Sequence, residues 1–457
     1  MIEHEQLDKV LILCKKSIKR QWIREIEKFS YLDESFEMFS VEGTKKQREK
    51  IYQRFKQASK GILVLNYHLV PYDLELLNTL GFQLVIQDEV HTIKARTGKI
   101  NGAVKKVSQK ADYVIFLTGT PIMSRPDDLY GIIQLADNQF FPKWKEFEQH
   151  YIFKEFNGSY NRIIGYRHLD ELREKVQSIL IQRTEHEVSI DLPETVYHQV
   201  DCEWDSTQQR LKDALDKKKL QIGAQIQKLN DLKELTPFQE EQKARLEASV
   251  KGLISAFQML ANDPRLFRYS RSASFRNDYG KLIPESYEGS SKTQQTLDII
   301  TEIIEAGQKV IIFSQYETCI QFLANEIQEK LKAPVLQYTG QVCDEERERN
   351  VQLFMEDDDY QILAGTNALA EGVNLQVANH ILNYEQPDTP AIKIQRTGRA
   401  RRASSKYKTV FVHDMITDNS KDIEKLENLN KIMGLVDGVV SVNQAQSESL
   451  KQIMEKY

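Results

Sequence analysis

Short apolar runs alternate with amphipathic stretches over the first 190 residues of the chain. The runs occupy residues 10–13, 61–65, 84–86 and 114–117. Between the first two lies a stretch, 18–29, in which Trp22, Ile26 and Phe29 recur at helical spacing. Strands of four or five apolar residues separated by helices are typical of a parallel sheet that is covered on both faces.

The pattern changes in the middle of the chain. Residues 206–260 are rich in Lys, Gln, Glu and Leu, and their apolar positions keep a helical period that only Pro237 interrupts. Those positions are Leu211, Leu215, Ile222, Ile226 and Leu229. We predict two or three long helices, either as a projecting hairpin or as solvated helices with one apolar seam.

Strand-like runs then return at residues 309–313, 335–338, 361–364, 380–383 and 409–412. From residue 421 onward, Ile423, Leu426 and Met433 predict a helix that packs back on the body. The chain is therefore expected to be α/β, with a first lobe at 1–195, a helical insertion and linker at 196–290, a second lobe at 291–420 and a C-terminal helical brace at 421–457.

Composition narrows the class of protein. The 457 residues are 40% hydrophobic and 28% charged, which is typical of a globular chain. The net charge is -5, so nucleic-acid binding would need local basic patches. No apolar run is long enough for a membrane helix, and no apolar core of the signal-peptide type follows the charged N-terminus. The four cysteines form no CxxC pair, so we expect neither a zinc site nor a disulfide framework, and a reducing cytoplasm fits.

Two carboxylates stand where a predicted strand ends. Asp88 and Glu89 directly follow residues 84–86, and the carboxyl ends of parallel strands are where α/β sheets bind ligands. One carboxylate could hold Mg²⁺ against nucleotide phosphates while the other deprotonates a water. The alternative is an acidic surface turn.

Further motifs follow this pair in a fixed order. Residues 88–91 read DEVH, 117–122 read LTGTPI, 179–184 read ILIQRT before Leu192-Pro193, and 263–266 read DPRL. SKT at 291–293 precedes KVIIFSQY at 309–316, AGTNALAEGVNL occupies 364–375, and QRTGRARR occupies 395–402. This ordered set resembles helicase superfamily two and, within it, the Swi/Snf-type ATPases.

The resemblance implies two RecA-like lobes that hydrolyse ATP with Mg²⁺ between them. Asp88 would position the Mg²⁺, Glu89 would act as general base, and Arg399 and Arg402 would stabilise the transferring phosphoryl group. Gln395 and Gly372 would also contact the nucleotide. The two arginines lie three residues apart and would share a helix face. The alternative is a solvated basic face, since seven of the 16 residues 393–408 are basic and none is acidic.

The family pattern also implies coupling and DNA-binding residues. His91 would sense the nucleotide and contact the third motif through Thr118 and Thr120. The family binds the phosphate backbone of a DNA duplex rather than its base edges. The positions that match these contacts are Lys94, Ser124, Arg125, Gln315, Thr339, Gly340 and Asn374.

The phosphate-binding loop of the family, G-x-x-x-x-G-K-[ST], does not occur in the sequence. Residues 10–29 match the motif that follows this loop, with Lys15 in place of Pro. The chain is thus expected to begin just downstream of the loop. It would be a fragment, one part of a motor whose N-terminal segment is encoded separately, or a natural variant. We expect an ATP-dependent double-stranded DNA translocase; the alternative is a non-hydrolysing nucleic-acid-binding module or one part of a split motor.

Overall fold

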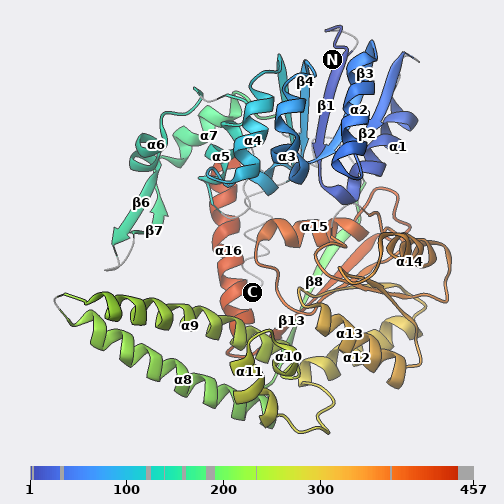
Figure 1. The fold of residues 1–457 in the computed structure, drawn as a ribbon. Helices are drawn as coiled ribbons and strands as arrows, with labels where there is room; N and C mark the ends of the chain where they lie inside the picture. Colours follow the sequence, from blue (N-terminus) through green and yellow to red (C-terminus); the bar gives the residue numbers. More distant parts are fainter. Residues whose placement is uncertain are drawn as a thin grey trace. The chain divides into compact units, whose positions relative to one another are not determined.

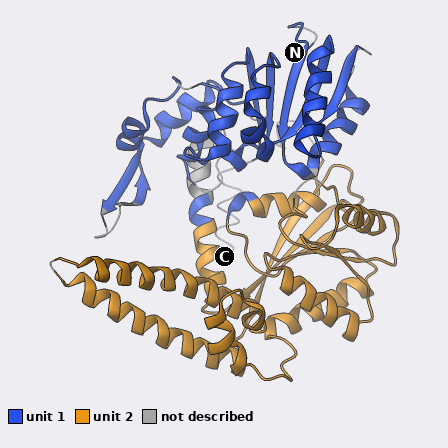
Figure 2. Cartoon of the chain, in the orientation of Figure 1, with its two compact units in different colours: residues 1–182, 389–391, 430–457 blue, residues 183–388, 392–429 orange. Residues whose placement is uncertain are grey.

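The computed structural model describes residues 2, 5–30, 35–119, 125–137, 139–156, 161–181, 191–232, 234–370 and 373–440 (Figure 1). Its contacts divide the chain into two compact units, which Figure 2 shows in blue and orange. Unit 1 comprises residues 1–182, 389–391 and 430–457, and unit 2 comprises residues 183–388 and 392–429. The four-part division by sequence stays a prediction.

Unit 1 is built on a five-stranded parallel sheet in the order β2-β3-β1-β4-β5. Its strands are β1 (Lys9–Cys14), β2 (Phe36–Ser40), β3 (Lys60–Asn66), β4 (Leu84–Asp88) and β5 (Tyr113–Leu117). Its helices are α1 (Lys19–Phe29), α2 (Lys45–Gln57), α3 (Val70–Leu77), α4 (Lys99–Ser108) and α5 (Asp128–Ile133). The four strands expected from the apolar runs are confirmed, and β2 is an additional strand.

Both faces of this sheet are buried, because alternate residues of each strand face opposite sides. On β1, Leu11 and Leu13 join a core with residues of α2 and α4, whereas Val10 and Ile12 pack with Trp22 of α1. The predicted doubly covered parallel sheet is therefore present, and its central strands are apolar throughout.

A small accessory layer follows in unit 1. It consists of α6 (Trp144–Tyr151), the antiparallel pair β6 (Ile152–Phe156) and β7 (Asn161–Tyr166), and α7 (Leu169–Gln177). A separate aromatic core that includes Tyr130, Phe141 and Phe147 holds it against α5.

Unit 2 carries a six-stranded parallel sheet in the order β10-β11-β9-β12-β13-β8. Its strands are β8 (Glu194–Cys202), β9 (Val310–Phe313), β10 (Val335–Tyr338), β11 (Ile362–Gly365), β12 (His380–Asn383) and β13 (Thr409–Thr417). The hydrophobic pattern does not predict β8, because its residues Glu194–Cys202 mix polar and apolar side chains in the manner of an edge strand.

Two long helices follow β8 and precede β9 in the sequence, in the stretch where long helices were predicted. They are α8 (Ser206–Asn230) and α9 (Pro237–Asn262), which pack side by side (Figure 1). Asp205 and Thr236 cap their N-termini with capping boxes, so Pro237 marks the start of α9 rather than a kink.

The remaining helices of the chain complete unit 2 and its C-terminal end. They are α10 (Leu266–Tyr269), α11 (Ala273–Asp278), α12 (Ser291–Glu305), α13 (Glu317–Lys330), α14 (Asp344–Glu356), α15 (Pro390–Ala400) and α16 (Lys421–Val440). The helix expected from residue 421 is confirmed as α16. Among the described residues, no helix has the length and apolar character needed to cross a membrane.

Candidate functional site

The carboxylate pair lies at the C-terminal end of β4, as predicted. The Asp88 carboxylate accepts a hydrogen bond from Trp22 Nε1 at 2.7 Å, and its backbone oxygen accepts one from the Tyr67 hydroxyl at 2.7 Å. Burial raises the pKa of Asp88, and the charge of Glu89 adds to this, while the Trp22 bond opposes it. A cation beside Asp88 would stabilise its ionised form.

Glu89 adopts a left-handed backbone conformation, with φ 49° and ψ 45°. This conformation is uncommon for a residue with a side chain and is enriched at functional sites. It lets the chain turn sharply from β4 into the short 3₁₀ helix Val90–Ile93. The turn leaves two consecutive carboxylates at the end of a buried strand.

His91 is buried and joins the carboxylate pair to the end of β5. Its Nδ1 lies 3.1 Å from Glu89 Oε2 and 3.0 Å from Thr118 Oγ1. The structure thus brings together three residues that the sequence assigned to base and coupling roles. Thr120, the second predicted coupling threonine, lies outside the described residues.

Neighbouring helices hold the segment after this turn. Asn101 of α4 donates to the backbone oxygens of Ile93 and Gly131 at 2.8 and 3.3 Å. A Cβ on Gly131 would lie 2.0 Å from the Lys94 oxygen, so α5 approaches this segment as closely as glycine permits.

The DNA-contact candidates of unit 1 lie beside this segment. Lys94 Nζ forms a 2.7 Å ion pair with Asp128, whose side chain is buried. Arg125 is half exposed and lies 3.6 Å from Asp127. Ser124 lies outside the described residues. Arg125 is therefore the more accessible of the two described candidates.

In unit 2, the centre of α15 is anchored by Arg396, which is fully buried. Its guanidinium donates to the side-chain oxygens of Asn367 and Asn383 at 2.8 Å each and to the Glu385 backbone oxygen at 3.3 Å. Burial lowers the pKa of Arg396 to about 10, which leaves it charged at neutral pH. Sequence reasoning gave Arg396 no role, although it stands three residues before Arg399 and so on the same helix face.

The two arginines proposed for phosphate lie at the end of α15. Arg399 donates to the Val373 backbone oxygen at 2.9 Å. Helix α15 ends at Ala400, so Arg402 lies beyond it. The prediction that Arg399 and Arg402 share one helix face is therefore wrong. Directly after the helix, Arg401 Nε donates to the Pro193 oxygen at 2.8 Å, next to β8.

Arg402 lacks a compensating negative charge among the described residues. Burial lowers the pKa of Arg402, and no acidic group raises it. Its Nε is buried and has no hydrogen-bond partner in the described part of the chain. A partly buried guanidinium in this state would be stabilised by an anion such as phosphate. Gln395, one of the nucleotide-binding candidates, is half-buried, and Gly372 lies outside the described residues.

The four DNA-contact candidates of unit 2 differ in accessibility. The backbone N–H of Gln315 donates to the Glu385 carboxylate, and Thr339 is buried. Gly340 is exposed and donates to Glu317 Oε1 at 2.5 Å, and Asn374 is also exposed. Gly340 and Asn374 are thus the two of these candidates that solvent reaches freely.

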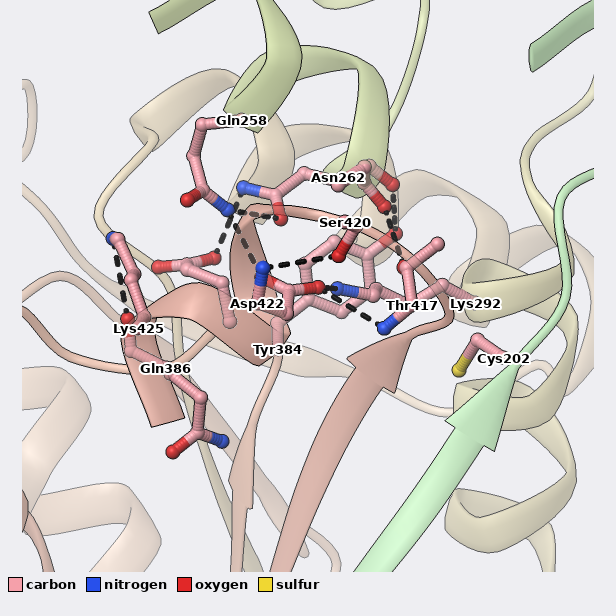
Figure 3. Close-up of polar contacts among 12 residues, drawn as sticks. Cys202, Gln258, Asn262, Lys292, Tyr384, Gln386, Thr417, Ser420, Asp422 and Lys425 are labelled. Carbon is pink, nitrogen blue, oxygen red and sulfur yellow. Dashed lines mark hydrogen bonds and ion pairs between the residues drawn. The ribbon is translucent and has the colours of Figure 1, made fainter. Parts of the chain in front are cut away.

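A buried polar network lies at the end of β13 in unit 2 (Figure 3). Lys292 Nζ and Asp422 Oδ2 form a 2.5 Å ion pair with both side chains almost fully buried. Gln258 donates to Asp422 Oδ1 at 3.0 Å, and the Thr417 hydroxyl donates to the Ala261 oxygen at 3.1 Å. The network therefore ties α9, α12 and β13 to the start of α16.

Two parallel α/β sheets, with a carboxylate pair at the end of a strand in the first and an arginine-bearing helix in the second, define a protein of the helicase superfamily two class. The model of the SNF2-related domain matches residues 1–265, and that of the helicase conserved C-terminal domain matches residues 292–404. The chain belongs to the SNF2-related family.

Relatives are found in bacteria, viruses and eukaryotes. An uncharacterized ATP-dependent helicase of Mycoplasma genitalium is 24% identical over 98% of this chain and 39% of its own length. A probable global transactivator of Orgyia pseudotsugata multicapsid polyhedrosis virus is 25% identical over 91% of this chain and 78% of its own. The ATP-dependent helicase FUN30 of Saccharomyces cerevisiae is 23% identical over 96% of this chain and 43% of its own length. The chain therefore spans less than half of two of these three relatives.

Two solved structures are similar to the chain at 21% identity. The Sulfolobus solfataricus SWI2/SNF2 ATPase core in complex with dsDNA aligns over 96% of this chain and 88% of that one, with a TM-score of 0.37. The C-terminal part of the Fun30 ATPase domain aligns over 57% of this chain and 97% of that one, with a TM-score of 0.42.

Proposed function

We propose that this chain is the core of an ATP-dependent double-stranded DNA translocase. The observation that carries the proposal is the arrangement after β4, where Asp88 and Glu89 end a buried strand and His91 links Glu89 to Thr118. Burial opposes ionisation of Asp88 in unit 1, and Arg402 in unit 2 lacks a described anionic partner. Mg²⁺ would supply a cation to the first group, and a phosphate would supply an anion to the second.

The residues at the end of β4 fit a magnesium ion. Mg²⁺ prefers oxygen ligands and binds proteins through one or two carboxylates together with substrate phosphates. Asp88 supplies such a carboxylate, and its raised pKa shows that a nearby cation would stabilise its ionised form. When bound, the ion would neutralise negative charge on the phosphates.

Glu89 is assigned the role of general base. It would accept a proton from the attacking water, and His91 lies 3.1 Å from its carboxylate to hold it in position. Thr118, hydrogen-bonded to the same ring nitrogen, would relay the state of the nucleotide to the residues that follow β5.

Arg399 and Arg402 are assigned the role of stabilising the negative charge that develops during phosphoryl transfer. Arginine suits this role because its guanidinium stays charged and binds phosphate oxygens bidentately. Arg396, held by two asparagines, positions α15, which carries Arg399, and is not assigned to substrate. None of the residues of this sequence is assigned to the phosphate-cradling loop.

Duplex DNA is the proposed track. Arg125, Gly340 and Asn374 are the exposed candidates for contacts with the phosphate backbone, and Lys94 would join them on exchanging Asp128 for a phosphate. Such contacts carry no sequence information, so we expect DNA binding that weakens steeply with salt and hardly depends on sequence.

The test is displacement of a third strand from a DNA triplex, measured together with ATP turnover. A translocase releases the third strand only with ATP and leaves the duplex strands paired. Separation of the duplex strands would contradict the proposal. ATP-independent, salt-sensitive DNA binding without turnover would instead support the alternative, a nucleic-acid-binding module or one part of a split motor.

A further inference from the structure

Three potential metal ligands meet on the accessory layer of unit 1. His150 stands in the last turn of α6, His168 directly precedes α7, and Glu171 lies in the first turn of α7. One ligand atom from each residue lies within 4.8 Å of the others. His150 Nε2 is 2.8 Å from Glu171 Oε2, and the two imidazole rings stack with centroids 4.5 Å apart.

The surrounding residues hold these ligands in position. The Tyr151 hydroxyl donates to Glu171 Oε1 at 2.8 Å, which leaves Oε2 directed at His150. Arg167 Nε donates to the His150 backbone oxygen at 2.9 Å and so ties the end of α6 to the residue before His168. Hydrogen bonds to the outer atoms of a ligand are what orients metal ligands in proteins.

The backbone at His168 adds an independent sign of function. His168 has φ 54° and ψ 36°, a left-handed conformation that few residues with side chains adopt. Conformations of this kind cluster at ligand-binding sites. Here it brings the His168 ring over that of His150, on the same side of α7 as Glu171.

The chemistry of the three groups selects one class of ion. Two imidazole nitrogens and one carboxylate oxygen form a ligand set used by zinc sites that keep a position open for water or substrate. Mg²⁺ and Ca²⁺ prefer oxygen ligands, so a site with two histidines disfavours them.

The three ligand atoms lie within 4.8 Å of one another, so side-chain rotations would bring them to zinc-binding distances. Tetrahedral ligands at about 2.0–2.1 Å from zinc stand roughly 3.3 Å apart. The 2.8 Å contact between His150 and Glu171 would widen slightly as the ion replaces the shared proton, and His168 would rotate inward. All three side chains are exposed, so an ion from solvent reaches them directly.

We propose that His150, His168 and Glu171 bind a divalent transition-metal ion of the zinc type. The ion would clamp α6 to α7 across the β6–β7 hairpin, and it would keep at least one coordination position open to solvent. This site is separate from the carboxylate pair after β4, and it does not depend on the proposed translocase activity.

The proposal is tested by calorimetric titration of the full chain with Zn²⁺ in excess Mg²⁺, so that oxygen-rich sites are occupied. We expect one saturable site that His168→Asn and Glu171→Gln each weaken at least about tenfold. Asn tolerates the left-handed conformation, so His168→Asn removes the imidazole without the backbone strain of other substitutions. His68→Asn, at an exposed histidine elsewhere in unit 1, is the matched control and should bind like the wild type.

A second readout identifies the ligands. Co²⁺ in place of Zn²⁺ should give the intense visible absorption of a tetrahedral site, and His168→Asn should lose it. The proposal is overturned if the wild type shows no saturable Zn²⁺ binding, or if His168→Asn binds as tightly as His68→Asn. Thermal unfolding in EDTA would show whether the variants are folded, since without metal the wild type and His168→Asn should unfold at similar temperatures.

Discussion

Breaking the ion pair between Lys292 and Asp422 should cost unit 2 several kcal/mol of stability. At an effective dielectric constant of about 20, two unit charges 2.5 Å apart attract each other by roughly 7 kcal/mol. Desolvation of both groups offsets much of this attraction. Removing one partner nevertheless leaves the other charge buried without compensation, which costs about 3–5 kcal/mol.

Lys292→Met removes the lysine charge and leaves the buried Asp422 carboxylate without its ionic partner. It keeps the length and apolar stem of the side chain, while Asp422 retains only neutral donors among the residues described above, Gln258 and the Thr417 amide. We expect the free energy of unfolding of unit 2 to fall by about 3–5 kcal/mol. Lys292→Met with Asp422→Leu should regain much of this loss, because no unpaired charge then remains.

The assay is equilibrium unfolding in guanidinium chloride followed by tryptophan fluorescence, with Trp204 reporting on unit 2. Arg245→Met is the matched control, since Arg245 pairs with Glu241 at 2.6 Å on the exposed surface of α9. An exposed pair contributes at most about 1 kcal/mol. If Lys292→Met cost no more than Arg245→Met, the argument that this buried pair holds α16 to α12 would be refuted.

Two further predictions concern the core and the turn after β4. Burial lowers the pKa values of His380 and His413 to about 4, so both stay neutral in the folded chain and bind protons more readily once unfolded. Stability should therefore be fully present above pH 6.5 and fall by a few kcal/mol as the pH drops toward 4. Urea unfolding across this range tests the prediction, and a pH dependence unchanged by His413→Asn would contradict it. Gly131→Ala should destabilise unit 1 by about 1–3 kcal/mol, because the alanine Cβ would lie 2.0 Å from the Lys94 backbone oxygen. An unchanged melting temperature would contradict this prediction.

Much of the fold follows from the hydrophobic pattern because the central strands are buried on both faces. Apolar runs such as 10–13 and 310–313 are typical of strands buried on both faces, and each forms a central strand. The edge strands β2 and β8 were not predicted, since a strand with one neighbour tolerates polar residues.

Only part of the candidate site could be predicted from the sequence. Asp88, Glu89 and His91 are adjacent in the chain, so the turn after β4 had to bring them together. The pairing of Lys94 with Asp128 depends on how α5 packs, and no local pattern shows it. Arg396 stood inside a predicted motif, but only the packing shows that it is buried.

The metal-ligand cluster was missed for the same reason. His150 and Glu171 are 21 residues apart, with the β6–β7 hairpin between them, and no standard ligand spacing links them. The structure shows the cluster because α6 ends beside the start of α7.

The central claim is that Glu89 serves as the base for ATP hydrolysis. The direct test is the turnover number with saturating duplex DNA for the wild type, Glu89→Gln and Glu240→Gln, a control at an exposed glutamate of α9. We predict DNA-stimulated hydrolysis that Glu89→Gln lowers by about 10²–10⁴-fold while Glu240→Gln leaves it unchanged. Hydrolysis by Glu89→Gln at the wild-type rate, or no hydrolysis by the wild type when nucleotide and DNA are both bound, would contradict the claim.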